Sequence, residues 1–316
     1  MPHAKDDLDF PDLPSFPEDV PTVPLLRLSL SKLENGDHTE TERFWKASCE
    51  LGFYYLDLTP DESHSANNGD KNTSQRPRID AKQLLHDVNE LFEISKDDIF
   101  EVSDPLPAPD VLTQPRPLIK SWMQQCHAIV TLILDLLNDR LGLPPGILAS
   151  MHRLHARSAD QLRWVLAPPQ PSDDRKTAMG EHTDFGSVTV LFNRLGGLQV
   201  LPPGEQEWRY VRPLRNHAVV NLGDALVKFS AGILNSNLHR VISPPGEQAA
   251  STRMSLVYFS RPEDDVMLKA LPGSLMIDEA KERRGGEEEP VSSKEWVLRR
   301  GLGVRTGDAH FTQKVI

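Results

Sequence analysis

Residues 179–192 read MGEHTDFGSVTVLF, and no other stretch of this 316-residue chain carries as much structural information. From about Ser187 the stretch is rich in Thr, Val, Leu and Phe, which predicts a β-strand with His182 and Asp184 at its entrance. Residues two apart in an extended segment point to the same side. His182 and Asp184 can therefore bind one metal ion from one segment.

A second short apolar segment, residues 238–242 (LHRVI), supplies a third candidate ligand, His239. We predict a strand that ends at Pro244 and Pro245, because proline cannot continue a β-ladder. This strand would bring His239 to the ion from the other side. Two imidazoles and one carboxylate on one face of a metal, with the opposite face open, are the ligand set of non-haem Fe(II) oxygenases. The open face leaves room for a chelating co-substrate and dioxygen.

Arg253 and Ser255 follow the same two-residue spacing in a third apolar run, residues 253–260 (RMSLVYFS). Arginine presents a planar fork that matches a carboxylate, which lysine does not reproduce. The hydroxyl of Ser255, two residues further on, can bind the same carboxylate. The alternative is a salt bridge on a solvent-facing edge strand, and the apolar residues of the run argue against it.

These blocks together resemble the isopenicillin N synthase-like branch of the 2-oxoglutarate, Fe(II)-dependent dioxygenases, from about residue 20 to residue 301. The resemblance implies that His182, Asp184 and His239 hold iron. It implies that Arg253 and Ser255 bind the distal carboxylate of 2-oxoglutarate, with dioxygen as the oxidant and ascorbate as a stimulant. Besides the motifs above, the blocks that occur in the family's order are FWKASCELGFYYL (44–56), GGLQV (196–200), VVNLGDAL (219–226) and LHRVISP (238–244).

The chain departs from the family pattern at two places. The family often carries an Asn-Tyr-Tyr-Pro-Pro-like segment whose polar side chains help to hold the co-substrate, whereas residues 165–169 read VLAPP here. The stretch near Ser95 is also shorter than in usual members, which have a further lobe at the mouth of the active site. The shorter stretch implies either an open pocket for a bulky substrate or an impaired enzyme.

The composition narrows the class of protein. The net charge of −11 argues against a general nucleic-acid or anionic-membrane surface, which would be basic. Two cysteines, Cys49 and Cys126, do not make a disulfide framework and fit a reducing compartment. The acidic, proline-rich start has no signal-peptide core, and no apolar run approaches the roughly 20 residues that span a bilayer. We therefore expect a cytosolic protein.

The coarse pattern predicts a mixed N-terminal region. A long helix should include Trp122, Cys126 and Leu137, which keep helical spacing, and end at Gly142. Earlier in the chain we expect a strand at 23–30, a helix opened by a capping box of Thr39 and Glu42, a polar loop at 57–78, a helix near 84–92 and an extended linker at 105–117.

After residue 162 the pattern changes to short apolar runs between Gly and Pro turns, which is typical of a jelly roll. The expected strands are 162–167, 187–192, 198–201, 208–211, 218–222, 226–229, 238–242 and 253–260. The fold class is therefore α+β with a mainly β core, a double-stranded β-helix (jelly roll) barrel with a flanking long helix. A charged loop at 281–290 and a terminal helix at 293–300, packed through Trp296 and Val297, should follow.

We divide the chain into a flexible arm (1–20), a shortened N-terminal dioxygenase region (21–116), a jelly-roll core with its supporting helix (117–301) and a tail (302–316). Four aromatic residues are candidates to line the active-site pocket or to fill the core: Phe185, Phe192, Tyr258 and Phe259.

The expected function is Fe(II)- and 2-oxoglutarate-dependent oxidation of a small organic metabolite, by hydroxylation, desaturation, ring formation or dealkylation, in specialised-metabolite biosynthesis. The iron carries this chemistry, so no separate catalytic acid or base is expected. Two alternatives stay open. An isopenicillin N synthase-like oxidase would use Arg253 and Ser255 for its own substrate's carboxylate, and a degenerate protein would bind without turnover. A zinc hydrolase would leave Arg253 and Ser255 without a role.

Overall fold

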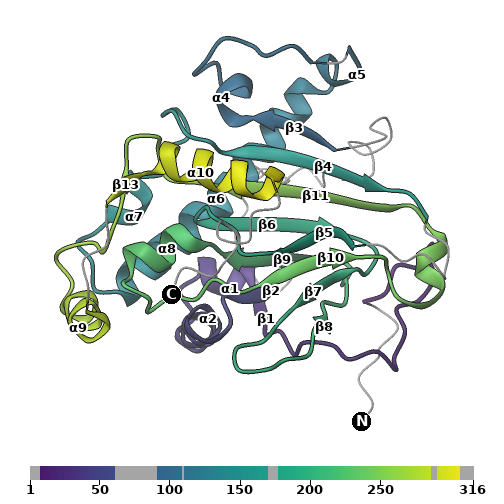
Figure 1. Cartoon of the computed structure of the whole chain (residues 1–316), viewed down its shortest axis with the longest axis horizontal. Helices are drawn as coiled ribbons and strands as arrows, with labels where there is room; N and C mark the ends of the chain where they lie inside the picture. The colour runs from purple at the N-terminus through teal and green to yellow at the C-terminus, as the bar shows by residue number, and fades with distance from the viewer. Residues whose placement is uncertain (1–7, 61–90, 109, 170–176, 286–289, 307–316) are drawn as a thin grey trace, which may run out of the picture.

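The computed structural model describes residues 8–60, 91–108, 110–169, 177–285 and 290–306. Most described strands form two sheets, and helices cover the larger one (Figure 1). In order across the larger sheet lie β1 (Arg27–Ser29), β2 (Phe53–Asp57), β9 (His217–Leu222), β6 (Val188–Asn193), β11 (Arg253–Ser260), β4 (Gln161–Ala167) and β3 (Phe92–Ser95). The smaller sheet contains β5 (Thr177–His182), β10 (His239–Ile242), β7 (Leu198–Val200) and β8 (Arg209–Tyr210). A third sheet has two antiparallel strands, β12 (Met267–Leu268) and β13 (Val291–Ser292).

The two main sheets pack through apolar side chains that alternate along their strands. Phe53 and Leu191 from the larger sheet and Val200 from the smaller one belong to one buried cluster. This is the arrangement of a jelly roll, in which inward positions of both sheets share a core. The predicted α+β class and the jelly roll are confirmed. Within the described residues the strands form separate sheets and no closed barrel.

The other face of the larger sheet is covered by α6 (Arg116–Arg140). Its buried stripe includes Trp122, whose ring meets Phe192 and Tyr258 edge-on at centroid distances of 5.4 and 6.5 Å. The long helix is confirmed, but it begins six residues before Trp122. Pro115 and Pro117 belong to its start, because proline is tolerated in the first turn of a helix. The other helices in the described part of the chain are α1 (Leu30–Glu34), α2 (His38–Glu50), α4 (Lys96–Ile99), α5 (Asp110–Thr113), α7 (Ile147–Ser150), α8 (Asp224–Phe229), α9 (Leu275–Arg284) and α10 (Ser293–Thr306), with a 3₁₀ turn at Gly246–Ala250.

Several local predictions were wrong. Residues 226–229, expected as a strand, lie in α8, because a short and fully buried helix has no polar face to reveal its period. The cap of α2 is Asp37, which accepts from the backbone N–H of Glu40, and not Thr39. The linker at 105–117 contains α5, and the charged loop at 281–290 begins inside α9.

The remaining local predictions were met in part. The strand at 23–30 is limited to β1, and α10 continues to Thr306. β5 was not expected as a strand. The polar loop beyond residue 60 and residues 84–90 of the expected helix lie outside the described residues. Phe92, at the end of that expected helix, begins β3.

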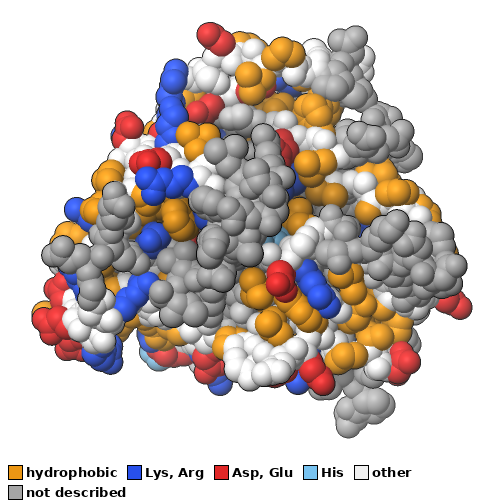
Figure 2. Space-filling view, viewed as in Figure 1, with side chains coloured by type: hydrophobic (Ala, Val, Ile, Leu, Met, Phe, Trp, Pro, Cys, Tyr) orange, Lys and Arg blue, Asp and Glu red, His pale blue; other side chains and the backbone are white. Residues whose placement is uncertain are grey.

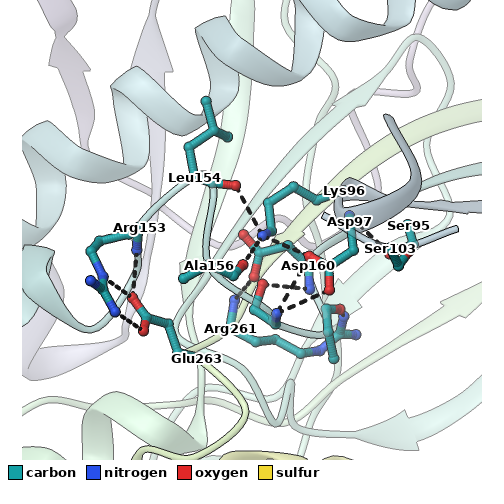
Figure 3. A network of polar contacts seen from close by, with 12 residues as sticks. Ser95, Lys96, Asp97, Ser103, Arg153, Leu154, Ala156, Asp160, Arg261 and Glu263 are labelled. Carbon is teal, nitrogen blue, oxygen red and sulfur yellow. Dashed lines mark hydrogen bonds and ion pairs between the residues drawn. The ribbon is translucent and has the colours of Figure 1, made fainter. Parts of the chain in front are cut away.

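A buried polar network joins the short segment near Ser95 to the core (Figure 3). The fully buried Lys96 pairs with Asp97 at 2.8 Å and donates to the carbonyl of Leu154. Asp160 accepts a hydrogen bond from the backbone N–H of Arg261 at 2.7 Å. Buried charges are tolerated only when they are paired and hydrogen-bonded, as they are here. The segment near Ser95 is therefore fixed to the jelly roll at the end of β11.

The N-terminal segment contacts β8 of the smaller sheet and the residues that follow it. Phe16 is buried against Tyr210, and Arg212 binds the carboxylate of Asp9 at 2.8 Å. The division of the chain into an arm, two regions and a tail stays a prediction. None of the described helices combines the length and hydropathy needed to cross a bilayer.

Candidate metal centre

The structure brings the three predicted ligands together between the two sheets. His182 ends β5, His239 begins the neighbouring β10, and the two residues are paired in the antiparallel register. Asp184 lies in the segment that leads from β5 to β6. Nε2 of His182 and Nε2 of His239 lie 3.9 and 3.8 Å from Oδ1 of Asp184. One ligand atom from each residue lies within 4.8 Å of the others, which is close enough to share one ion.

Backbone carbonyls fix the orientation of both imidazoles. Nδ1 of His182 lies 2.8 Å from the carbonyl oxygen of Gly180, and Nδ1 of His239 lies 3.1 Å from that of Asn237. A carbonyl can only accept, so each Nδ1 carries a proton, and each Nε2 is the ring nitrogen that lies near Asp184 and is placed to bind a metal. Metal-binding histidines in proteins are commonly held in this way.

Two side chains hold the carboxylate of Asp184. Its Oδ2 accepts from the hydroxyl of Thr189 at 2.6 Å and from the amide of Asn221 at 2.7 Å. Oδ1 is left to face the histidines. Thr189 and Asn221 are register partners on β6 and β9, so the sheet itself sets the position of both donors.

The electrostatics of the site favour a divalent cation. Burial, followed by the proximity of His239, lowers the pKa of His182 to about 4. Burial alone would raise the pKa of Asp184, but the two histidines and the donors Asn221 and Thr189 outweigh it and hold that pKa below its usual value. At neutral pH His182 is therefore a neutral imidazole and Asp184 a carboxylate, which are the protonation states that bind metal. The donor set fits ferrous iron.

Arg253 and Ser255 lie on β11 and face the same cavity as the metal ligands. Arg253 is 3% exposed, donates from Nε to the carbonyl of Gly196 at 2.8 Å, and lies 3.3 Å from the Ser255 hydroxyl through Nη1. Burial lowers its pKa to about 10, so it stays charged at neutral pH. No carboxylate of the described residues pairs with it. A buried cation without an anion is costly, so this guanidinium is suited to an anionic ligand.

A glycine makes room for this arginine. Gly197 has a φ of +107°, and a Cβ there would lie 2.4 Å from the carbonyl oxygen of Ile242 and 3.2 Å from Nε of Arg253. Any other residue would therefore displace the backbone or the guanidinium.

The metal ligands and the arginine occupy different levels of one cavity of about 710 Å³, a volume that includes its open mouth. We call His182, Asp184 and His239 the metal end, and Arg253 with Ser255 the anchor end. On β6, Thr189 contacts the metal end and Asn193 pairs with Ser255. These two residues are four positions apart, which corresponds to roughly 13 Å of extended strand.

The wall of the cavity beside the anchor end is apolar. Ala167 and Val165 on β4 are the register partners of Arg253 and Ser255, and both line the cavity. Where the family often carries polar side chains, Val165 and Ala167 offer side chains that cannot form hydrogen bonds. In Figure 2 a small area of histidine surface is visible near the centre of the face, with hydrophobic side chains around it.

The predicted pocket aromatics separate into two groups. Phe259 lines the cavity, whereas Phe192 and Tyr258 pack with Trp122 on the helical side of the sheet. Phe185 is not among the lining residues, and the guanidinium of Arg261 stacks over its ring. Phe53 was not singled out from the sequence, yet it lines the cavity and meets the ring of His239 at 5.4 Å.

The comparisons with known proteins agree with this geometry. A model of the 2OG-Fe(II) oxygenase superfamily matches residues 152–262. A 2-oxoglutarate-dependent dioxygenase of Aspergillus fumigatus is 30% identical, over 89% of this chain and 86% of the relative. One from Gibberella zeae is also 30% identical, over 81% and 85%.

Among solved structures, a full-length Neurospora crassa protein in complex with alpha-KG and thymine has the same fold. It gives a TM-score of 0.68 at 22% identity, over 92% of this chain and 98% of that one. The fold agrees along nearly the whole length of both chains. The 30% identity to the two fungal relatives, over more than four fifths of each chain, establishes that the chain belongs to the 2OG-Fe(II) oxygenase superfamily.

Proposed function

We propose that this protein is an Fe(II)- and 2-oxoglutarate-dependent dioxygenase that oxidises a small organic metabolite. His182, Asp184 and His239 would hold the iron, and Arg253 with Ser255 would bind the distal carboxylate of 2-oxoglutarate. The observation that carries the proposal is the buried guanidinium of Arg253, which pairs with no described carboxylate and faces the same cavity as the metal ligands. A zinc hydrolase has no use for that cation.

Each part of the cavity has a separate task in this reaction. Bound ferrous iron would supply the oxidative decarboxylation of 2-oxoglutarate by dioxygen, coupled to oxidation of a substrate C–H bond. Arg253 orients the co-substrate by a charge-assisted hydrogen bond, to which Ser255 adds a hydroxyl. The apolar side chains Leu191, Val257 and Phe259 line the space between the sheets, together with Arg163, whose guanidinium lies 4.8 Å from the centre of the Phe259 ring. The chemistry calls for no acid or base from the protein.

The apolar wall at the anchor end favours one second candidate. In an oxidase that uses no 2-oxo acid, Arg253 and Ser255 would bind a carboxylate of the substrate itself. Val165 and Ala167 provide none of the polar contacts that help to hold 2-oxoglutarate in the family. A protein that binds without turnover is the third candidate, and the complete ligand set argues against it.

The stoichiometry of succinate formation separates these candidates. Candidate metabolites are screened for stimulated succinate release in the presence of Fe(II), 2-oxoglutarate and ascorbate. We expect one succinate for each substrate molecule oxidised. Substrate oxidation without succinate would identify the oxidase. A protein that oxidises none of the metabolites and consumes no 2-oxoglutarate in the presence of Fe(II) would be the binding protein.

We further propose a cytosolic location and a small-molecule substrate in specialised metabolism. Both cysteines are free thiols, which fits a reducing compartment. The net charge of −11 disfavours a nucleic-acid or anionic-membrane partner.

A further inference from the structure

The C-terminal helix α10, yellow in Figure 1, contacts the segment that carries Asp184. The indole N–H of Trp296 donates to the carbonyl of Phe185 at 3.0 Å. One turn later, Nη2 of Arg300 donates to the hydroxyl of Thr183 at 2.9 Å and lies 3.3 Å from its carbonyl oxygen. Thr183 stands between the ligands His182 and Asp184. The helix therefore reaches the metal end of the cavity from behind.

The same segment is held by the start of α8. The backbone N–H of Asp224 donates to the carbonyl of Asp184 at 2.7 Å, and that of Ala225 donates to the carbonyl of Gly186 at 3.0 Å. Gly223 permits this close approach, because a Cβ there would lie 2.3 Å from the carbonyl oxygen of Gly186. Main-chain hydrogen bonds thus fix the residues on the C-terminal side of Asp184.

The side chain of Asp224 joins the two supports. Its Oδ2 accepts from the hydroxyl of Thr183 at 3.0 Å and from Nη2 of Arg300 at 2.9 Å. The Asp224 and Arg300 side chains are 1% and 5% exposed, so solvent screens their attraction little. A change in the backbone of Thr183 that altered the separation of His182 from Asp184 would therefore also break the hydrogen bonds of its hydroxyl to both partners.

We propose that Arg300, through Thr183 and Asp224, is a positioning residue that sets the spacing of His182 and Asp184 for the metal. This inference rests on the proposed function, because it assumes that these side chains bind a divalent ion. An ordinary packing role would tie α10 to the body of the protein without affecting metal affinity. The positioning role is favoured because Arg300 and Asp224 both form hydrogen bonds with Thr183, the residue between the two ligands.

The test is Co(II) binding to the full-length protein, measured by calorimetry and by visible absorbance under anaerobic conditions. Arg300→Gln should weaken Co(II) binding at least tenfold, and Arg300→Lys should recover part of the loss because an ammonium can still reach Asp224. The matched control is Arg299→Gln on the same helix. Arg299 is half exposed and pairs with Glu295, so this variant should bind Co(II) like the parent protein.

Thermal unfolding checks that each variant is folded. If Arg300→Gln does not fold, Thr183→Val takes its place, because it removes the hydroxyl and keeps the side-chain shape. It should bind Co(II) several-fold more weakly. A folded Arg300→Gln or Thr183→Val protein with the parent's Co(II) affinity would overturn the inference while leaving the proposed function intact. A parent protein that binds no Co(II) would overturn the proposed function and this inference with it.

Discussion

At the metal end of the cavity, Oδ2 of Asp184 accepts hydrogen bonds from Thr189 and Asn221, and each histidine is held by a backbone carbonyl. At the anchor end, Arg253 donates to the carbonyl of Gly196 and lies near the hydroxyl of Ser255, and its neighbours on β4, Val165 and Ala167, present only apolar side chains to the cavity. Asp184 therefore has two side-chain supports and each histidine has one backbone support, whereas the proposed contact to 2-oxoglutarate relies mainly on the guanidinium of Arg253. Single substitutions should have unequal effects at the two ends.

The largest effect is expected from the removal of a ligand. His239→Ala leaves only His182 and Asp184 for the metal, and it should abolish Fe(II)-dependent succinate release. Normal turnover by this variant would show that the metal is bound elsewhere.

Arg253→Ala should have the next largest effect. A hydrogen bond to a charged group contributes roughly 1.5–3 kcal/mol, so the apparent affinity for 2-oxoglutarate should fall at least about tenfold. Co(II) affinity should not change. The control is Arg209→Ala, which removes a partly exposed arginine that pairs with Glu205 on the smaller sheet. An unchanged 2-oxoglutarate affinity in Arg253→Ala would favour the oxidase.

Asn221→Ala tests whether the metal end has duplicated support. Loss of a side chain that orients a ligand commonly costs about 10–100-fold in metal affinity. Thr189 still donates to Oδ2 of Asp184, so we expect the lower limit, roughly tenfold, measured by Co(II) calorimetry. A complete loss of binding in a folded variant would mean that the two donors do not substitute for one another.

The smallest effect should be a gain in 2-oxoglutarate affinity, caused by a substitution at the anchor end. Val165→Thr keeps the side-chain shape and adds a hydroxyl beside Ser255, its register partner on β11. One neutral hydrogen bond is worth about 1 kcal/mol, so the KM for 2-oxoglutarate should fall by roughly fivefold. A higher KM would show that this wall does not face the co-substrate.

The sequence was sufficient to predict the metal ligands, but it did not predict the side chains that hold them in place. His182, Asp184 and His239 stand in short segments whose spacing is sufficient to predict convergence, because residues two apart in a strand share a side. Their supports could not be found in this way. Thr189 and Asn221 meet Asp184 only through the pairing of β6 with β9, and strand register is a long-range property. Asn221 does lie in the VVNLGDAL block, which was the available signal.

The fold, too, was predictable where the local sequence pattern determines the structure, and was missed where long-range pairing or burial determines it. Seven of the eight expected strand runs after residue 160 correspond to strands, because they are short apolar runs bounded by Gly and Pro turns. The exception became α8, whose residues are all buried and so show no helical period. β5 was missed because its sequence, TAMGEH, lacks a strand-like apolar pattern and is stabilised by its pairing with β10. Arg300 gave no signal either, since its partner Asp224 lies 76 residues away.

The central claim is that the metal end and the anchor end act together on one ferrous ion and one molecule of 2-oxoglutarate. An anaerobic titration of the Fe(II)-loaded protein with 2-oxoglutarate tests this most directly. We predict a visible metal-to-ligand charge-transfer band that saturates at one equivalent in the parent protein, is absent in His239→Ala and requires at least about tenfold more co-substrate in Arg253→Ala. A parent protein that binds Fe(II) and develops no such band would contradict the claim.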